Sequence, residues 1–284
     1  MNRLAPPRDY IDLLDALHTA LTPRTYVEIG VESGKSLSLA LPGTVLVGID
    51  PAVRVRHPLS GTAHLFRETS DEFFALRSLR AVLDGHTLDI AFIDGLHHFD
   101  VVLRDFRNLE AAASSESVIL IHDCLPTSVR NAKRVRETPD WAGDVWKAII
   151  GLRKFRPDLA ITVLDIAPTG LAIITQLNPT SRVLFDQYAP ICEELSPLLL
   201  PEAAAARRDL IGAVTTQWST VFNQVPAKPF RDISIEQLIK DRSRRRPTID
   251  NVLWKLRRRL RFSKLGPTAA AVNRLARRPP RQNP

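Results

Sequence analysis

The sequence predicts an α/β protein with a mostly parallel sheet and helices on both of its faces. Short β-branched runs alternate with stretches of helical apolar spacing, and each run ends at glycine or aspartate. Strands are expected at residues 25–29, 44–49, 63–67, 88–93, 117–121, 159–166 and 171–177. Only four residues, 167–170, separate the last two strands, so these two must be antiparallel. The expected sheet therefore has seven strands, with one reversed at an edge.

The helical stretches lie between these strands and at both ends of the domain. An opening helix is predicted over 10–21, and others after Gly34, around 73–76, over 99–109 and over 144–155. Two more helical segments are expected at 181–199 and 201–218. We divide the chain into an N-terminal helix (1–22), a ligand-binding domain (23–178), a helical extension (179–241) and a basic tail (242–284).

Composition excludes several classes of protein. The 284 residues are 44% hydrophobic, which is enough for a large core and excludes a wholly disordered chain. Two cysteines cannot supply a disulfide framework, and the first ten residues lack the apolar stretch of a secretory signal. No window is long and apolar enough for a membrane span. A cytoplasmic location is therefore expected.

The positive charge is concentrated in the tail. Residues 242–284 hold 14 Lys and Arg and one acid, a net charge of +13, whereas the rest holds 25 bases and 30 acids, a net charge of −5. Within the tail, residues 248–265 predict a basic amphipathic helix suited to an anionic membrane surface. A solvated tail or packing on a partner subunit in a homo-oligomer is the alternative. Nucleic-acid binding is disfavoured because no known nucleic-acid-binding motif accompanies the basic residues.

Polar residues follow the first two predicted strands. Gly30 and Gly34 open a turn where the backbone can approach a ligand, and Asp50 ends the second strand, 20 residues after Gly30. An acid at that spacing is typical of residues that accept hydrogen bonds from ribose hydroxyls. Since open α/β sheets bind ligands at the carboxyl ends of their strands, we expect a nucleoside-containing ligand there.

The spacing around these glycines narrows the choice of ligand. A phosphate-binding loop needs four residues between its glycine and Gly-Lys-Ser, but Gly30 and Gly34 enclose three. A dinucleotide site needs glycine at the position of Glu32, whose carboxylate would repel pyrophosphate. A nucleoside cofactor without phosphates fits better, and S-adenosylmethionine is one. A nucleotide-hydrolysing enzyme that uses Lys35 remains an alternative.

Five segments together resemble the class I S-adenosylmethionine-dependent methyltransferases, particularly the branch with small-molecule and sugar O-methyltransferases. They are VEIGVESGKS (27–36), VGID (47–50), FIDGLHHFDVVLRDF (92–106), VILIHDCLP (118–126) and GDVWKAI (143–149). The resemblance covers about 23–176 and implies a Rossmann-like sheet and methyl transfer. Many of these enzymes have glycine at the position of Glu32, which is a departure in the first loop.

The resemblance also implies which residues bind the cofactor. Glu28, Gly30 and Ser36 would surround its methionine part, and Asp50 would hold the ribose. Ser70 or Asp71 would lie near adenine, and Asp94 would face the sulfonium. The implied acceptor is a hydroxyl of a small molecule, sugar or glycolipid.

A reaction centre is expected where the fourth and fifth strands end. Asp94, His97 and His98 follow one strand, and His122 and Asp123 follow the other. Neighbouring strands are about 5 Å apart, so these groups should meet. A histidine suits the base that removes the acceptor's proton: we favour His97, while His122 could be a base or a positioning residue.

A metal ion is an alternative way to activate the acceptor. Asp94 and Asp123, with His97, a water or another carboxylate, could hold Mg²⁺ and lower the pKa of the acceptor hydroxyl. Related O-methyltransferases use carboxylates at these two strand ends, and some have an amide ligand at the position of Cys124.

Simpler interpretations exist for other residues near this centre. Cys124 is expected to be a small buried residue, Trp141 and Trp146 to be core residues, and Asp144 and Lys147 to form an ion pair. A non-enzymatic alternative for the whole chain is a degenerate Rossmann domain that serves as an adaptor at a membrane or in a complex. The identity of the acceptor depends on the 125–142 loop and on the helices after residue 178.

Overall fold

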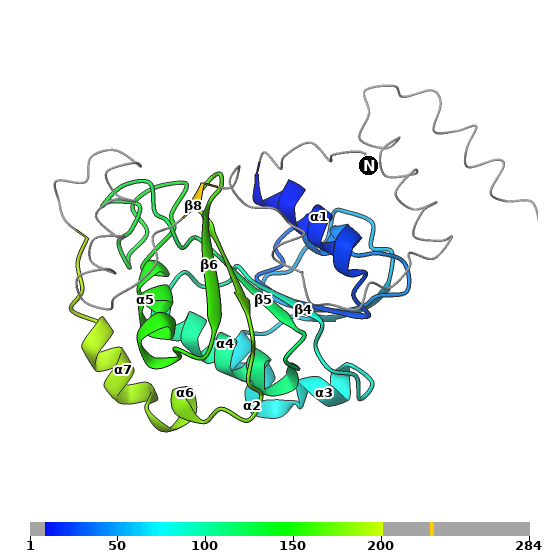
Figure 1. The fold of residues 1–284 in the computed structure, drawn as a ribbon. Coiled ribbons are helices and arrows are strands. Elements are labelled where there is room, and N and C mark those ends of the chain that lie inside the picture. Colours follow the sequence, from blue (N-terminus) through cyan, green and yellow to red (C-terminus); the bar gives the residue numbers. More distant parts are fainter. Residues whose placement is uncertain (1–8, 201–227, 230–284) are drawn as a thin grey trace, which may run out of the picture. The chain divides into compact units, whose positions relative to one another are not determined.

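The computed structural model describes residues 9–200 and 228–229, and its centre is an open sheet (Figure 1). The predicted strands are present with ends shifted by no more than a few residues. In chain order they are β1 (Thr25–Ile29), β2 (Val45–Ile49), β3 (Thr62–Phe66), β4 (Ile90–Ile93), β5 (Val118–His122), β6 (Ala160–Asp165) and β7 (Leu171–Thr175). A two-residue strand, β8 (Lys228–Pro229), also joins the sheet, whose order is β3-β2-β1-β4-β5-β7-β6-β8.

The expected fold class is confirmed, but the reversed strand is not at the edge of the sheet. Strands β1 to β5 are parallel to their neighbours, and β7 pairs antiparallel with both β5 and β6. The short turn fixes only that β6 and β7 are antiparallel neighbours. It does not decide which of them lies beside β5, and the register that pairs His122 with Leu171 places β7 there. Strand β6 then pairs parallel with β8.

The helices agree with the predicted positions with three differences. They are α1 (Tyr10–Leu21), η1 (Leu37–Leu39), α2 (Ser70–Leu76), α3 (Leu79–Val82), α4 (Phe99–Ala112), α5 (Trp146–Phe155), α6 (Val183–Asp186) and α7 (Tyr188–Leu195). The helix expected after Gly34 is only a 3₁₀ turn, because Pro42 and Gly43 end the segment before a longer helix can form. The 181–199 segment is two helices, and α3 was not predicted.

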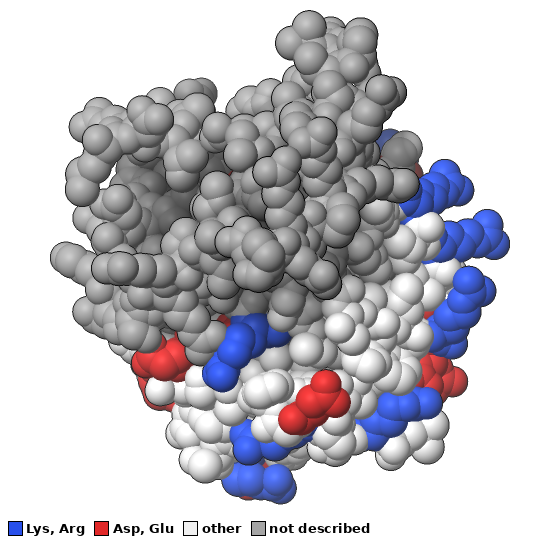
Figure 2. Space-filling model, turned by 90° about the vertical axis from the view of Figure 1, so that its right-hand side faces the viewer, with Lys and Arg blue, Asp and Glu red and all other residues white. Residues whose placement is uncertain are grey.

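Two predicted segments lie outside the described residues. These are the 201–218 helix and the amphipathic helix at 248–265, together with the whole basic tail. Among the described residues, no helix is long and apolar enough to cross a membrane. On the described part of the face drawn in Figure 2, basic side chains lie among acidic and uncharged ones, so the charge there is mixed in sign.

The sheet is covered by different elements on its two faces (Figure 1). On one face, α1 and η1 pack against strand residues such as Tyr26, Leu46 and Phe92. On the other face, α2 to α5 and α7 pack against the alternate residues, such as Val27 and Ala91. This alternation follows from the two-residue period of a strand. Helices α6 and α7 contact α4 and α5, so the 183–195 region extends the second face.

Candidate active site

The tip of β1 approaches the tip of β4 very closely at Gly30. A Cβ atom on Gly30 would lie 2.0 Å from the main-chain oxygen of Asp94, and Gly30 has a φ of +88°. The amide of Gly30 donates to the oxygen of Ile49 (2.9 Å), and the amide of Asp94 donates to the oxygen of Ile29 (2.8 Å). Glycine is therefore required here on two grounds, conformation and space. Its predicted place beside a cofactor stays a prediction.

Asp50 is held by backbone amides at the end of β2. Its Oδ2 accepts from the amide of Glu32 (2.8 Å) and its Oδ1 from the amide of Ala52 (2.6 Å). Glu32 has a φ of +46°, a left-handed conformation, and its side chain is exposed. Glutamate in place of glycine at position 32 is therefore accommodated, because its side chain lies in solvent and its amide orients Asp50. Each carboxylate oxygen keeps a second lone pair for a further donor.

Glu28 and Ser36, both predicted cofactor residues, are hydrogen-bonded to each other. The Ser36 hydroxyl donates to Glu28 Oε1 (2.6 Å), and the Tyr26 hydroxyl donates to Oε2 (2.7 Å). Glu28 is completely buried, and this burial raises its pKa to about 8, although both hydroxyls act in the opposite direction. The pair fastens the loop after β1 to the strand beneath it. Contact with the cofactor remains a prediction for both residues.

The two residues expected near adenine begin helix α2. Ser70 is buried, whereas Asp71 forms a two-pronged ion pair with Arg104 of α4 at 2.8 and 2.7 Å. Hydrogen bonding from Arg104 lowers the pKa of Asp71. Asp71 thus connects α2 to α4. Its role near adenine remains a prediction.

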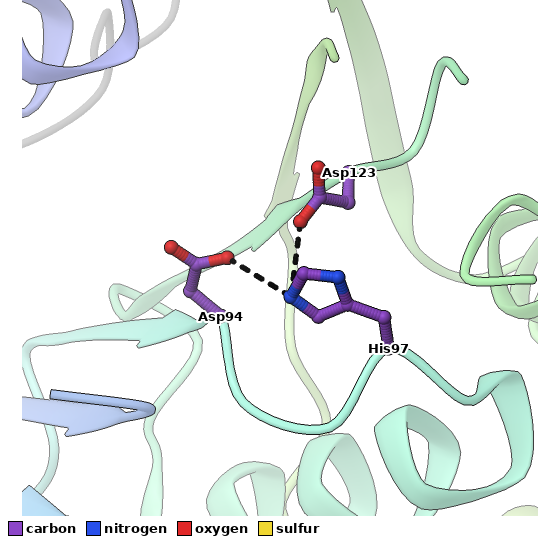
Figure 3. A group of neighbouring side chains, drawn as sticks. All are labelled: Asp94, His97 and Asp123. Atoms are coloured by element: carbon purple, nitrogen blue, oxygen red, sulfur yellow. Dashed lines mark ion pairs between the residues drawn. The ribbon is translucent and has the colours of Figure 1, made fainter. Parts of the chain in front are cut away.

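Four of the five residues predicted for the reaction centre meet where β4 and β5 end, and His98 does not. The His97 Nε2 lies 3.2 Å from Asp123 Oδ2 and 3.7 Å from Asp94 Oδ1 (Figure 3). The His122 Nδ1 lies 3.1 Å from the same Asp94 oxygen and 3.3 Å from the same Asp123 oxygen. Two carboxylate oxygens therefore face two imidazole nitrogens. We call these four residues the Asp-His cluster.

His97 is oriented by the segment that precedes α5. Its Nδ1 lies 2.7 Å from the main-chain oxygen of Trp141, and because a carbonyl only accepts, Nδ1 carries a proton. The Trp141 ring stacks on the imidazole, with centroids 5.1 Å apart. A Cβ on Gly143 would lie 2.0 Å from the oxygen of His97, and the Asp144 amide donates to that oxygen (3.1 Å). These contacts direct Nε2 toward the two carboxylates.

His122 is the buried member of the cluster. Burial by itself would lower its pKa, but the charges of Asp94 and Asp123 outweigh that effect and raise the pKa to about 10. Its ring lies 4.2 Å from the ring of Tyr10, between centroids. Its Nε2 is buried and has no hydrogen-bond partner among the described residues. The geometry favours the positioning role over that of a base.

The neighbouring polar residues have separate structural roles. His98 is the N-cap residue of α4, but its side chain makes no capping hydrogen bond; its Nε2 lies 3.2 Å from the oxygen of Arg134, away from the cluster contacts. Cys124 is completely buried and Trp146 is a core residue, as predicted. The predicted ion pair between Asp144 and Lys147 is present at 3.8 Å.

Three members of the cluster have the donor atoms of a metal site. One ligand atom each from Asp94, His97 and Asp123 lies within 4.8 Å of the others. Two carboxylate oxygens and one imidazole nitrogen suit a divalent cation. Asp94 and Asp123 with His97 are one of the predicted metal-binding sets, the alternative to simple base catalysis.

Two contacts of the cluster were not predicted from the sequence. Thr169, in the turn between β6 and β7, donates a hydrogen bond from its hydroxyl to Asp123 Oδ1. Tyr10, the first residue of α1, covers His122. Both come from segments far from the cluster in sequence. In the sequence, Thr169 is recognisable only as part of a turn, and Tyr10 only as the start of an amphipathic helix.

Comparison with protein families supports the resemblance found in the sequence. Residues 27–124 match the model of a family described as a methyltransferase domain. This match runs from within β1 to just after β5 and, together with the Rossmann-like sheet, supports a class I methyltransferase. A search of curated proteins finds no relative that matches the chain.

Several solved structures are similar to the chain. Cofactor-bound Rv0187 from MTB is 16% identical, with 63% of this chain and 84% of that chain covered and a TM-score of 0.44. TomG from Streptomyces achromogenes, an O-methyltransferase of tomaymycin synthesis in complex with SAM, is 15% identical, with 63% and 84% covered and a TM-score of 0.44. An O-methyltransferase from Bacillus cereus in complex with SAH is 16% identical, with 61% and 83% covered and a TM-score of 0.42.

Proposed function

We propose that the protein transfers a methyl group from S-adenosylmethionine to a hydroxyl of a small molecule, sugar or glycolipid. The observation that carries the proposal is the orientation of His97. Its Nδ1 is held by Trp141, and its Nε2 faces Asp94 and Asp123 where β4 and β5 end. His97 follows Asp94, whose backbone lies against Gly30. A base fixed in this way suits deprotonation of an acceptor that lies beside S-adenosylmethionine.

The chemistry of the residues present fits S-adenosylmethionine. Asp50 is partly exposed, and two amides fix its carboxylate in a position to accept hydrogen bonds from ribose hydroxyls. Asp94 offers a carboxylate to a positive charge beside the Gly30 turn. When bound, the cofactor supplies an electrophilic methyl group on a sulfonium. The predicted set for it is Glu28, Gly30, Ser36, Asp50, Ser70, Asp71 and Asp94.

In the proposed reaction, His97 holds the proton that the acceptor loses. The acceptor hydroxyl would give its proton to Nε2 as its oxygen takes the methyl group that bound S-adenosylmethionine would supply, and the electron pair of the sulfur–carbon bond would stay on sulfur. The imidazolium would be stabilised by Trp141 on Nδ1 and by Asp123 on Nε2. His122, between Asp94 and Asp123, positions the two carboxylates.

A metal-assisted version is the second candidate, and the compact donor set of Asp94, His97 and Asp123 favours it. An ion such as Mg²⁺ held by these residues would lower the pKa of the acceptor hydroxyl. In that version, His97 would hold the ion through Nε2, and water or another base would take the proton. The two versions differ in their response to a chelator.

The test is a labelled methyl-transfer assay against fractionated cell extracts, with and without chelator. Calorimetry with S-adenosylhomocysteine runs in parallel. We expect label transfer to a low-molecular-weight, sugar or lipid fraction, and nucleoside binding. Binding of ATP or GTP that needs Lys35, without binding of S-adenosylhomocysteine, would instead indicate a nucleotide-hydrolysing enzyme. No nucleoside binding at all would favour an adaptor.

For the tail we propose attachment to an anionic membrane surface through the 248–265 segment, which lies outside the described residues. Its support is the charge pattern of the sequence. Removal of residues after Asp241 should release the protein from anionic vesicles in a sedimentation assay. Unchanged sedimentation would contradict the attachment and leave the solvated tail or a partner subunit.

A further inference from the structure

The turn between β6 and β7, residues 166–170, forms one wall of the Asp-His cluster. The Thr169 hydroxyl donates to Asp123 Oδ1, and both residues are buried, with relative exposures of 1% and 5%. The main-chain oxygen of Thr169 also accepts from the amide of Leu125 (2.7 Å). The turn therefore holds the segment after β5 on both sides of Cys124.

The turn approaches this segment so closely that only a glycine fits at its end. Gly170 has a φ of +78°, and a Cβ there would lie 2.7 Å from Leu125 Cβ. The turn is closed by the Gly170 amide, which donates to the oxygen of Ile166 (2.9 Å). It is also tied to the start of α1, where the Tyr10 amide donates to the oxygen of Ala167 (3.3 Å). These contacts fix the backbone of the turn and therefore the position of Thr169 beside Asp123.

Asp123 needs such an external support. Its φ of +59° is left-handed, a conformation that non-glycine residues keep only when their surroundings hold them. Its two oxygens have different partners. Oδ1 accepts from Thr169, while Oδ2 faces His97 at 3.2 Å and His122 at 3.3 Å.

We propose that Thr169 is a positioning residue of the reaction centre, whose hydroxyl orients Asp123 so that Oδ2 faces the two histidines. A hydroxyl has one proton to donate, and the one on Thr169 is used at Oδ1. Without it, the carboxylate is free to rotate or to draw a histidine toward Oδ1. The proposal rests on the proposed function for its effect on turnover, but not for its effect on the cluster geometry.

The experiment compares three variants of the full-length protein. Thr169→Val keeps the side-chain volume and removes the hydroxyl, and Thr169→Ser keeps the hydroxyl. Thr169→Ala removes the hydroxyl and leaves a smaller side chain. The backbone bond to Leu125 is available in all three. Circular dichroism and thermal melting identify a variant that fails to fold, in which case the Ala variant replaces the Val variant.

The first readout needs neither donor nor acceptor. The chain has seven histidines, and their imidazole signals are observed by NMR in histidine-labelled protein, with His97→Gln and His122→Gln for assignment. We expect the signals of His97 and His122 to move in the Val or Ala variant and to stay at wild-type positions in the Ser variant. Unmoved signals in a folded Val or Ala variant would overturn the proposal.

The second readout is the initial rate of methyl transfer in the active extract fraction. Loss of a residue that orients a functional group typically costs 10–100-fold, so we expect a fall of about tenfold or more with the Val variant and recovery with the Ser variant. Binding of S-adenosylhomocysteine should stay within about twofold of wild type. Equal rates for the Val and Ser variants would overturn the proposal. Absence of any methyl transfer in the wild type would contradict the proposed function, while the NMR result would still decide the role of Thr169.

Discussion

The two halves of the candidate site are built in different ways. At β1 and β2, the carboxylate of Asp50 is held by the amide of Ala52, two residues further along the chain, and by the amide of Glu32 in the loop after β1. At β4 and β5, four side chains pair with one another, and their supports come from α1, from the segment before α5 and from the β6–β7 turn. The first half depends on backbone geometry, and the second on charge pairing between distant segments.

This difference has a consequence for substitutions. In the first half, replacing one side chain leaves the backbone that shapes the site in place. In the second half, removing one group leaves its buried neighbours with unbalanced charge. We therefore expect changes in the first half to act on cofactor binding and changes in the second half to act on turnover.

The largest effect should follow His97→Gln. Because general base catalysis contributes roughly 10²–10⁴-fold, turnover in the labelled-transfer assay should fall by at least about 100-fold, with S-adenosylhomocysteine binding nearly unchanged. His98→Gln is the matched control, since His98 bonds to the oxygen of Arg134 and makes none of the cluster contacts described above. Similar losses in both variants would contradict the assignment of the base.

Asp50→Ala should weaken binding of S-adenosylhomocysteine about 100-fold in calorimetry. Two hydrogen bonds to a charged group contribute roughly 1.5 kcal/mol each, which corresponds to that factor. Asp89→Ala is the control, because Asp89 also accepts a backbone amide, from Arg24 at 2.7 Å, but at the opposite end of the sheet. Unaltered affinity in Asp50→Ala would show that the cofactor does not use the end of β2.

Glu28→Gln should change how stability depends on pH. The pKa of Glu28 is raised from 4.5 to about 8 in the folded chain, so the native state keeps a proton that the unfolded state releases. Wild-type stability should therefore fall with rising pH between these values, by about 1.4 kcal/mol per pH unit from this group at most. The glutamine variant lacks this loss, so its stability relative to wild type should increase over that interval.

Urea unfolding at several pH values measures this difference. Glu116→Gln, at an exposed glutamate, is the control. A constant difference between Glu28→Gln and wild type would mean that Glu28 is ionised in the folded chain across the whole interval. In that case, the loop after β1 would contain a buried negative charge, and the contrast between the two halves would disappear.

The smallest effect should follow Tyr10→Leu. The aromatic contact with His122, at 4.2 Å between ring centroids, should contribute about 1 kcal/mol to the free energy of unfolding. Tyr10→Phe keeps the ring and should retain most of that stability in urea unfolding. Equal loss in both variants would show that the stability depends on the phenol hydroxyl and not on the ring contact with His122.

The fold was largely predictable because its signals are local. Strands such as β1 and the helix α1 have the predicted bounds, since buried β-branched runs and a helical stripe are properties of neighbouring residues. One missed feature has a non-local cause and the other a local one. The position of β7 between β5 and β6 depends on which strand hydrogen-bonds to β5, and the failure of a helix after Gly34 depends on the room left before Pro42.

The sequence by itself determined that Asp94, His97, His122 and Asp123 meet, because carboxyl ends of adjacent parallel strands lie at one edge of a sheet. Only the tertiary structure decided how they are oriented. Trp141 fixes the proton on His97, Tyr10 covers His122, and Thr169 holds one oxygen of Asp123. These supports come from segments brought together by packing across the sheet, and such contacts leave no periodic pattern in the chain.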